Sequence, residues 1–206
     1  MAYDLIIFDF DGTLADSAEW FFDALEDAAE AFGFLKVTPA AVEQLHAFGM
    51  KEMLRAIEVP LDRLSAIEEH MRQRGSENIA ALRLFEGVPE VLTALRLRGA
   101  KLAVVSSNSE SVVRAVLGPT LAGYMDGFGC SAPAFGKEAK LLETITRSGV
   151  EVSRAIYVGD EVRDIEAAQT VGMASAAVAW GFMAPSALER LKPSMIIDHV
   201  GAVAEL

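Results

Sequence analysis

The chain has little cysteine and no long apolar run. Its 206 residues contain one cysteine, Cys130, which excludes an internal disulfide and any metal site built from several cysteines. We interpret Cys130 as a small core residue. No apolar run reaches the ~18 residues that a membrane-spanning helix needs, and the N-terminus lacks the basic and apolar regions of a signal peptide. The sequence therefore predicts a soluble, cytoplasmic protein with no membrane partner.

Positive charge is also scarce. The sequence has 18 Lys and Arg against 30 Asp and Glu, so its net charge is −12. Such a chain repels phosphate backbones, and we expect no nucleic-acid partner. It would instead need a divalent cation beside any anionic substrate. The three histidines, His46, His70 and His199, share no motif and are expected to have no chemical role.

The most informative stretch runs from Asp4 to Ser17. Leu5 to Phe8 is an apolar run long enough for a strand buried on both faces and too short for a buried helix. Asp9 and Asp11 follow it, and Gly12 turns the chain away. Two carboxylates beside a core are unfavourable unless they are paired or bind a metal, so a nucleophile, a metal ligand or both are indicated. A plain Asp-Gly turn is the alternative.

The rest of the chain divides into two patterns. From Asp16 to about Leu84 the pattern is helical with no convincing strand, which predicts an inserted helical domain. After Gly87 strands and helices alternate, which predicts an α/β fold with a parallel sheet covered on both faces. One helix is expected to begin at Thr38-Pro39. The other expected helices are 16–33, 50–57, 61–74 with Gly75 as a breaker, 89–98, 109–117 ended by Gly118, 137–148 and 164–171. The expected strands are 101–105, 128–130, 155–158, 174–179 and 195–197.

Polar residues follow several of these strands, at the edge where open parallel sheets bind ligands. Ser106, Ser107 and Asn108 lead into a helix N-terminus, a site that suits a phosphate. A plain N-cap is the alternative.

Charged residues follow the next two strands. Lys137, in Phe135-Gly136-Lys137, stands in a first helical turn, where it opposes the helix dipole, so a role as a cation for phosphate is indicated. Lys140 is a competing candidate. Asp160 and Asp164 can point at one site from a tight turn, unless the loop is merely acidic and Asp164 an N-cap.

The segment Asp9-Phe10-Asp11-Gly12-Thr13 after an apolar strand resembles the first motif of the haloacid dehalogenase-like hydrolase superfamily, which is mostly phosphatases. The segment 106–108, Lys137, and the pair Asp160 and Asp164 match the second, third and fourth motifs of that superfamily, in this order. Asp16-Ser17 and the segment 178–182 resemble phosphoglycolate phosphatases. The resemblance covers nearly the whole chain. It implies a Rossmann-like catalytic core of residues 1–15 and 85–206 and a helical cap domain of residues 16–84.

The resemblance also implies a Mg²⁺-dependent phosphatase that hydrolyses a small phosphorylated metabolite, phosphoglycolate or a similar ester, as a monomer or homodimer. Asp9 would be the nucleophile and Asp11 the general acid and base. Mg²⁺ would be bound by the Asp9 carboxylate, the Asp11 carbonyl and Asp160, with Asp164 binding it directly or through water. The phosphate would be bound by Thr13, Ser106, Ser107, Asn108 and Lys137.

Several departures and alternatives remain at this point. Dehalogenase relatives lack the second aspartate, so Asp11 argues against carbon–halogen chemistry. β-Phosphoglucomutase relatives carry histidine where this chain has Phe21, and phosphatases often carry serine where it has Glu161. A phosphosugar mutase and a catalytically weak regulator that binds a phosphometabolite stay open as alternatives. Lys51 and Arg55 are candidates for setting substrate specificity, although solvated helix positions would explain them as well.

Overall fold

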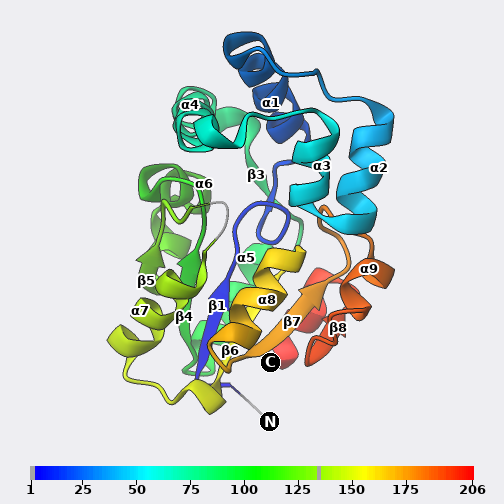
Figure 1. Ribbon diagram of the computed structural model, residues 1–206. Helices are drawn as coiled ribbons and strands as arrows, with labels where there is room; N and C mark the ends of the chain where they lie inside the picture. The colour runs from blue at the N-terminus through cyan, green and yellow to red at the C-terminus, as the bar shows by residue number, and fades with distance from the viewer. Residues whose placement is uncertain (1–2, 134–135) are drawn as a thin grey trace.

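A six-stranded parallel sheet forms the centre of the computed structural model, which describes residues 3–133 and 136–206 (Figure 1). The strand order is β5-β4-β1-β6-β7-β8, so the chain builds one side of β1 first and then the other. The order reverses beside β1, and in open α/β sheets the ligand crevice lies at such a point. The strands are β1 (Leu5–Phe8), β4 (Lys101–Val105), β5 (Met125–Gly129), β6 (Ala155–Gly159), β7 (Ala174–Val178) and β8 (Met195–Ile197).

Helices cover both faces of this sheet, as the alternating pattern predicts. Successive side chains of β1 point to opposite faces, and all four are fully or almost fully buried. Ile6 and Phe8 belong to one apolar core, and Leu5 and Ile7 belong to another. The helices are α5 (Val88–Leu97), α6 (Glu110–Ala122), α7 (Glu138–Ser148), α8 (Val162–Thr170) and α9 (Pro185–Glu189), with 3₁₀ turns η3 (Val152–Arg154) and η4 (Val200–Glu205).

A group of helices lies over the carboxyl ends of the strands (Figure 1). The chain leaves the sheet through β2 (Ala15–Asp16) and returns through β3 (Arg83–Leu84), and these two short strands pair antiparallel. The intervening elements are α1 (Ala18–Phe32), α2 (Pro39–Phe48), α3 (Met50–Ala56), η1 (Leu61–Arg63), α4 (Leu64–Glu77) and η2 (Ile79–Ala81).

These helices have an apolar core of their own. Its buried members come from residues 25–67, apart from Phe182 of the loop after β7. The predicted division into residues 16–84 and the remainder stays a prediction, and the separate core is the observation that supports it. None of the helices in the described residues is long and apolar enough to cross a bilayer.

Local contacts explain where the elements depart from the sequence prediction. The pairing of Asp16 with Arg83 holds Asp16 in a strand, so α1 begins two residues later, at Ala18. The expected breaker Gly75 lies inside α4, because Trp20 packs so closely that a Cβ on Gly75 would lie 3.1 Å from its ring. The prediction of no strand between 16 and 84 and the prediction of a break at Gly75 are therefore both wrong.

Gly118 has φ 70° and ψ 167° and interrupts α6, so the first helical segment ends at Leu117 as predicted, and a second short segment continues to Ala122. One further boundary differs. The helix expected from Asp164 begins at Val162 instead, because Glu161 and Asp164 form a reciprocal capping box. Cys130 is buried in the apolar core, which confirms its interpretation as a core residue.

Candidate active site

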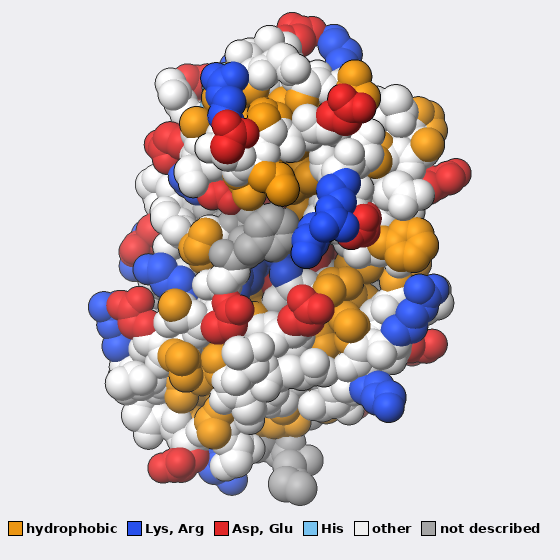
Figure 2. All heavy atoms as spheres, viewed as in Figure 1, with side chains coloured by type: hydrophobic (Ala, Val, Ile, Leu, Met, Phe, Trp, Pro, Cys, Tyr) orange, Lys and Arg blue, Asp and Glu red, His pale blue; other side chains and the backbone are white. Residues whose placement is uncertain are grey.

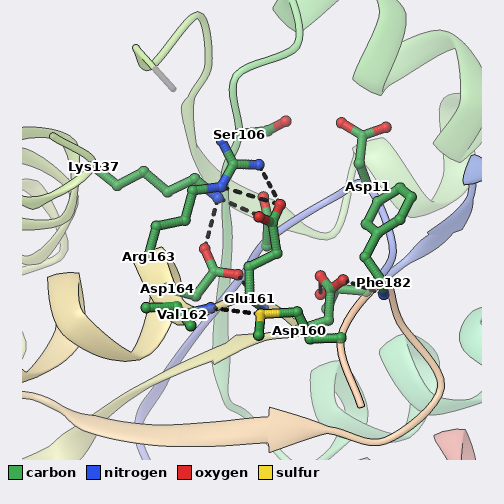
Figure 3. A network of polar contacts seen from close by, with 12 residues as sticks. Asp11, Ser106, Lys137, Asp160, Glu161, Val162, Arg163, Asp164 and Phe182 are labelled. Carbon is green, nitrogen blue, oxygen red and sulfur yellow. Dashed lines mark hydrogen bonds and ion pairs between the residues drawn. The ribbon is translucent and has the colours of Figure 1, made fainter. Parts of the chain in front are cut away.

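The carboxyl ends of β1, β4 and β6 and the start of α7 meet at one site (Figure 3). Asp9 follows β1, Ser106 follows β4 and Asp160 follows β6, while Lys137 immediately precedes α7. Each of these four residues is at most 2% exposed. Buried ionisable groups are costly unless they interact with one another, so their convergence indicates a functional site. Phe135, which the sequence placed beside Lys137, lies outside the described residues.

Lys137 is the cation at the centre of this site. Its Nζ lies 2.9 Å from Asp9 Oδ2 and 2.7 Å from Asp164 Oδ1, and it donates a 3.3 Å hydrogen bond to the Tyr157 hydroxyl. Burial lowers the pKa of Lys137, but the charges of Asp164 and Asp9 outweigh that effect, so its pKa is raised and the ammonium stays charged. The competing candidate Lys140 lies 3.7 Å from Glu143 instead.

Three buried carboxylates lie close enough together to bind one cation. One oxygen from each of Asp9, Asp160 and Asp164 lies within 4.8 Å of the others. Burial raises the pKa of Asp9 to about 7, although Lys137 opposes the shift. Burial also raises the pKa of Asp160 well above its usual value, and the nearby charges of Glu161, Asp164 and Asp9 add to this effect. A bound cation would relieve this crowding of like charges.

The donor set indicates which kind of cation fits. All three ligand candidates are carboxylates, and hard divalent cations prefer oxygen ligands. The residues present therefore fit a metal site, and this structure supports the cluster of Asp9, Asp160 and Asp164 as its protein ligands.

The Asp160 carboxylate is held by contacts from two other loops. Its Oδ1 accepts a 2.9 Å hydrogen bond from Thr13 Oγ1, and its Oδ2 accepts a 2.7 Å hydrogen bond from the Phe182 N–H. Gly12 and Gly181 flank the carboxylate, and a Cβ at either position would collide with Asp160. The Thr13 hydroxyl is thus engaged with Asp160, and its predicted contact with phosphate stays a prediction.

Asp164 connects the Lys137 ammonium to the start of α8. One carboxylate oxygen contacts Lys137, and the other accepts a 3.0 Å hydrogen bond from the Glu161 N–H, which completes the capping box. Glu161 in turn lies 2.5 Å from an Arg163 guanidinium nitrogen, and its side chain is 1% exposed. Figure 3 shows Arg163 reaching toward the site beside Lys137. Arg163 was not predicted from the sequence, since an arginine inside an acidic loop resembles an ordinary exposed arginine.

Asp11 lies on the opposite side of the site from Asp164 (Figure 3). The Asn108 side-chain amide donates a 2.8 Å hydrogen bond to Asp11 Oδ2, and the Asn108 N–H donates a 3.0 Å hydrogen bond to Ser106 Oγ. Withdrawal from water raises the pKa of Asp11, and hydrogen bonds from Ser17 and Asn108 oppose the shift. A carboxyl group with a raised pKa is suited to carry and transfer a proton near neutral pH.

A cavity of about 100 Å³ opens above the site, between Asp11 and the helices. Ser107 and Asn108 line its lower side, so the predicted phosphate-binding segment faces it. The upper side is mostly apolar. Lys51 and Arg55 do not line this cavity, and Arg55 pairs with Glu52 at the surface, where its side chain is 57% exposed. The apolar side chains include Phe21, Leu25, Met50, Leu54, Ile67 and Met71.

Comparisons with known proteins agree with this geometry. The family model described as haloacid dehalogenase-like hydrolase matches residues 6–178. The chain is 32% identical over 195 residues to a phosphoglycolate phosphatase of Synechococcus elongatus, which covers 94% of this chain and 92% of that protein. It is 30% identical to a phosphoglycolate phosphatase of Aquifex aeolicus, covering 87% and 86%. The crystal structure of a predicted phosphatase from Clostridium acetobutylicum matches with a TM-score of 0.84 at 20% identity, covering 100% of this chain and 98% of that chain.

Proposed function

The chain is a phosphatase of the haloacid dehalogenase-like hydrolase family, and we propose that it hydrolyses a small organic phosphomonoester through a phosphorylated Asp9. The observation that carries this proposal is the buried Asp9 carboxylate, 2.9 Å from Lys137 and two residues before Asp11. A carboxylate nucleophile divides hydrolysis into two easier steps. The relatives named above make phosphoglycolate the first substrate to test.

In the first step an Asp9 oxygen attacks phosphorus, and the bond from phosphorus to the ester oxygen breaks. Lys137 favours the ionised form of Asp9 and opposes the effect of burial, which raises the pKa of Asp9 to about 7. Asp11 gives its proton to the departing oxygen, and the raised pKa of Asp11 makes that proton available. The products of this step are an alcohol and an acyl phosphate on Asp9.

In the second step water attacks the phosphorus of the acyl phosphate. Asp11, now ionised, accepts the proton of that water, and Asp9 leaves as a carboxylate together with inorganic phosphate. The Ser106 hydroxyl, the Ser107 and Asn108 N–H groups and Lys137 would hold the phosphoryl oxygens during both steps. Both Asp9 and Asp11 end in their starting states, so the cycle is closed.

We propose Mg²⁺ as the metal, held by Asp9, Asp160 and the Asp11 carbonyl, with Asp164 beside them. When bound it supplies positive charge for the phosphoryl group in addition to that of Lys137, in a chain whose net charge is −12. The buried oxygen cluster supports this assignment because Mg²⁺ prefers few carboxylate ligands together with water. No sulfur or imidazole donor is part of that cluster in the described residues.

Phe21 supports hydrolysis over phosphosugar mutase chemistry. The Phe21 ring packs 5.4 Å from the Phe182 ring and lines the cavity above the site. A phenyl ring cannot exchange protons with a sugar hydroxyl, whereas a histidine at this position could.

The test is phosphate release from 4-nitrophenyl phosphate and from phosphoglycolate, with Mg²⁺, by wild type and Asp9→Asn. The amide keeps the shape of the carboxylate but is not a competent nucleophile, so turnover should fall by several orders of magnitude on both esters. Asp62→Asn, at an exposed position of η1, is the matched control and should retain activity. Turnover of Asp9→Asn near the wild-type rate would contradict the assignment, and a catalytically weak regulator would release little phosphate even as the wild-type protein.

A further inference from the structure

The cavity above the active site is continuous with the residues that would handle the leaving group. Asp11 and Asn108 line it, and Asp11 is the group that would protonate the departing oxygen. The leaving group of a phosphomonoester bound at Asp9 must therefore extend into this space. Its other walls come from α1, α3 and α4, and Figure 2 shows hydrophobic side chains reaching the surface on this side of the helices.

The charged residues of the cavity do not offer an open site for a second anion. The Arg72 guanidinium lies 2.8 Å from a Glu69 oxygen and 3.9 Å from a Glu68 oxygen. The Arg163 guanidinium lies 2.5 Å from Glu161. Both basic side chains of the lining thus already contact carboxylates.

The balance of charge points the same way. The lining contains the acidic residues Asp11, Glu68 and Glu161 and the basic residues Arg72 and Arg163. Asp11 holds a proton at the start of the first step, so the remaining two acidic and two basic side chains leave no net positive charge to attract a carboxylate on the substrate. The walls are mostly apolar, so the loss of hydration would oppose binding of that carboxylate.

We propose that this cavity binds an uncharged, apolar leaving group, so that the preferred substrates are phosphomonoesters of alkyl or aryl alcohols rather than of carboxylate-bearing ones. This inference rests on the proposed function, because it assigns the leaving-group side of that same site. The cavity of about 100 Å³ sets the size of the group. A cavity of about 150 Å³ lined by Leu, Ile and Phe takes up benzene, so a chain of a few carbon atoms fits here.

The test is a homologous series of ethyl, propyl, butyl and hexyl phosphate, measured beside phosphoglycolate with the Mg²⁺-loaded wild-type protein. The leaving-group chemistry is nearly constant along the alkyl series, so the series isolates binding. We expect kcat/KM to rise roughly fourfold per methylene until the cavity is filled, mainly through a falling KM. Ethyl phosphate shares the two-carbon skeleton of phosphoglycolate without its carboxylate and should be the better substrate.

Two variants at matched positions test whether the cavity is responsible. Leu64 is half-buried at the start of α4 and lines the cavity, whereas Leu61, three residues earlier, is 62% exposed and does not. Leu64→Arg should flatten the dependence of kcat/KM on the length of the alkyl group. It should also raise the ratio of phosphoglycolate turnover to ethyl phosphate turnover. Leu61→Arg should change neither quantity.

The outcomes separate this inference from the proposed function. Normal phosphate release with a flat or falling alkyl series, or with phosphoglycolate preferred to ethyl phosphate, overturns the inference and leaves the proposed function intact. No release from any ester overturns the proposed function and the inference with it. If Leu64→Arg does not fold, as judged by circular dichroism, the wild-type series alone decides.

Discussion

Thr13 donates a 2.9 Å hydrogen bond to Oδ1 of Asp160, although the two residues lie 147 positions apart in the chain. The bond joins the loop after β1 to the end of β6, the two strands between which the sheet reverses its order. It is buried, and it fixes the orientation of a carboxylate that we assign to the metal. A hydrogen-bonded partner of a ligand contributes to metal affinity almost as directly as the ligand.

We therefore predict that Thr13→Val weakens Mg²⁺ binding by roughly 10- to 100-fold. Valine keeps the shape of threonine but cannot donate to Asp160, so the carboxylate loses its fixed orientation. Isothermal titration calorimetry with MgCl₂ measures the effect. Thr13→Ser keeps the hydroxyl and is the control, which should bind within a few-fold of wild type. Equal affinities for all three proteins would place the metal away from Asp160.

Asp11→Asn should separate the roles of the two acids. The variant keeps the nucleophile Asp9, and its amide oxygen can still accept the hydrogen bond from Asn108. It loses proton transfer, which usually contributes a factor of ~10² to 10⁴. Aryl esters need little protonation to depart, so they should still phosphorylate Asp9, whereas alkyl esters should not.

Without its base, the Asp11→Asn variant should also accumulate the acyl phosphate. Mass spectrometry after an acid quench should find an adduct heavier by about 80 Da, the mass of one phosphoryl group, on Asp9. Asp9→Asn, treated in the same way, should carry no adduct. If no adduct forms and aryl and alkyl esters lose equal activity, Asp11 does not transfer the proton and the two-step mechanism is wrong.

The metal-free protein should lose stability as pH rises from about 4 to 7. Burial raises the pKa of Asp9 from 3.8 to about 7, and it raises the pKa of Asp160 as well. The folded protein therefore binds more protons than the unfolded chain across this window, and its free energy of unfolding falls as pH rises. Mg²⁺ binds the ionised carboxylates, so its stabilising effect should be larger at pH 8 than at pH 5.

Thermal melting at both pH values, with and without Mg²⁺, measures these two effects. Asp160→Asn is the informative variant, because its amide oxygen can accept from the Phe182 N–H and its NH₂ can donate to the Thr13 hydroxyl. It should have a smaller pH dependence and a much weaker response to Mg²⁺. A wild-type melting temperature that ignores saturating Mg²⁺ would count against the metal site.

Cys130 should resist alkylation in the folded protein. Burial raises the pKa of its thiol to about 12, and the charge of Glu110 adds to the shift. The thiolate is the reactive form, so very little is present at pH 8. Iodoacetamide at pH 8 should modify the native protein far more slowly than the same protein in urea. Similar rates in both conditions would show that the thiol is accessible and ionised.

The sequence was sufficient to find the acidic residues of the site, for a physical reason. Asp9 and Asp160 each follow a short apolar run, and such runs are recognisable as buried strands from the residues alone. Once the sheet is parallel, its strand ends meet at one edge, so these acids converge with Ser106 without further information.

Contacts between distant segments could not be predicted in the same way. The break expected at Gly75 fails because the ring of Trp20 fills the space where a side chain would stand. Arg163 was missed, and the specificity candidates Lys51 and Arg55 do not line the cavity, because the sequence alone does not show which basic side chain faces a cavity. That depends on how α3, α4 and α8 are packed, which no local pattern records.

The short ladder of β2 and β3 has a consequence for engineering. Because Asp16 lies opposite Arg83, the two ends of the helical insertion are adjacent in space. A two-residue Asn-Gly turn is the usual connection between such antiparallel partners. Joining Asp16 to Arg83 by that turn would close the polypeptide as a hairpin and leave the apolar cores on the two faces of β1 in place. We therefore expect that another helical segment could be inserted between the same two residues, and that it would change the cavity for the leaving group while the phosphate-binding residues of the sheet stay in place.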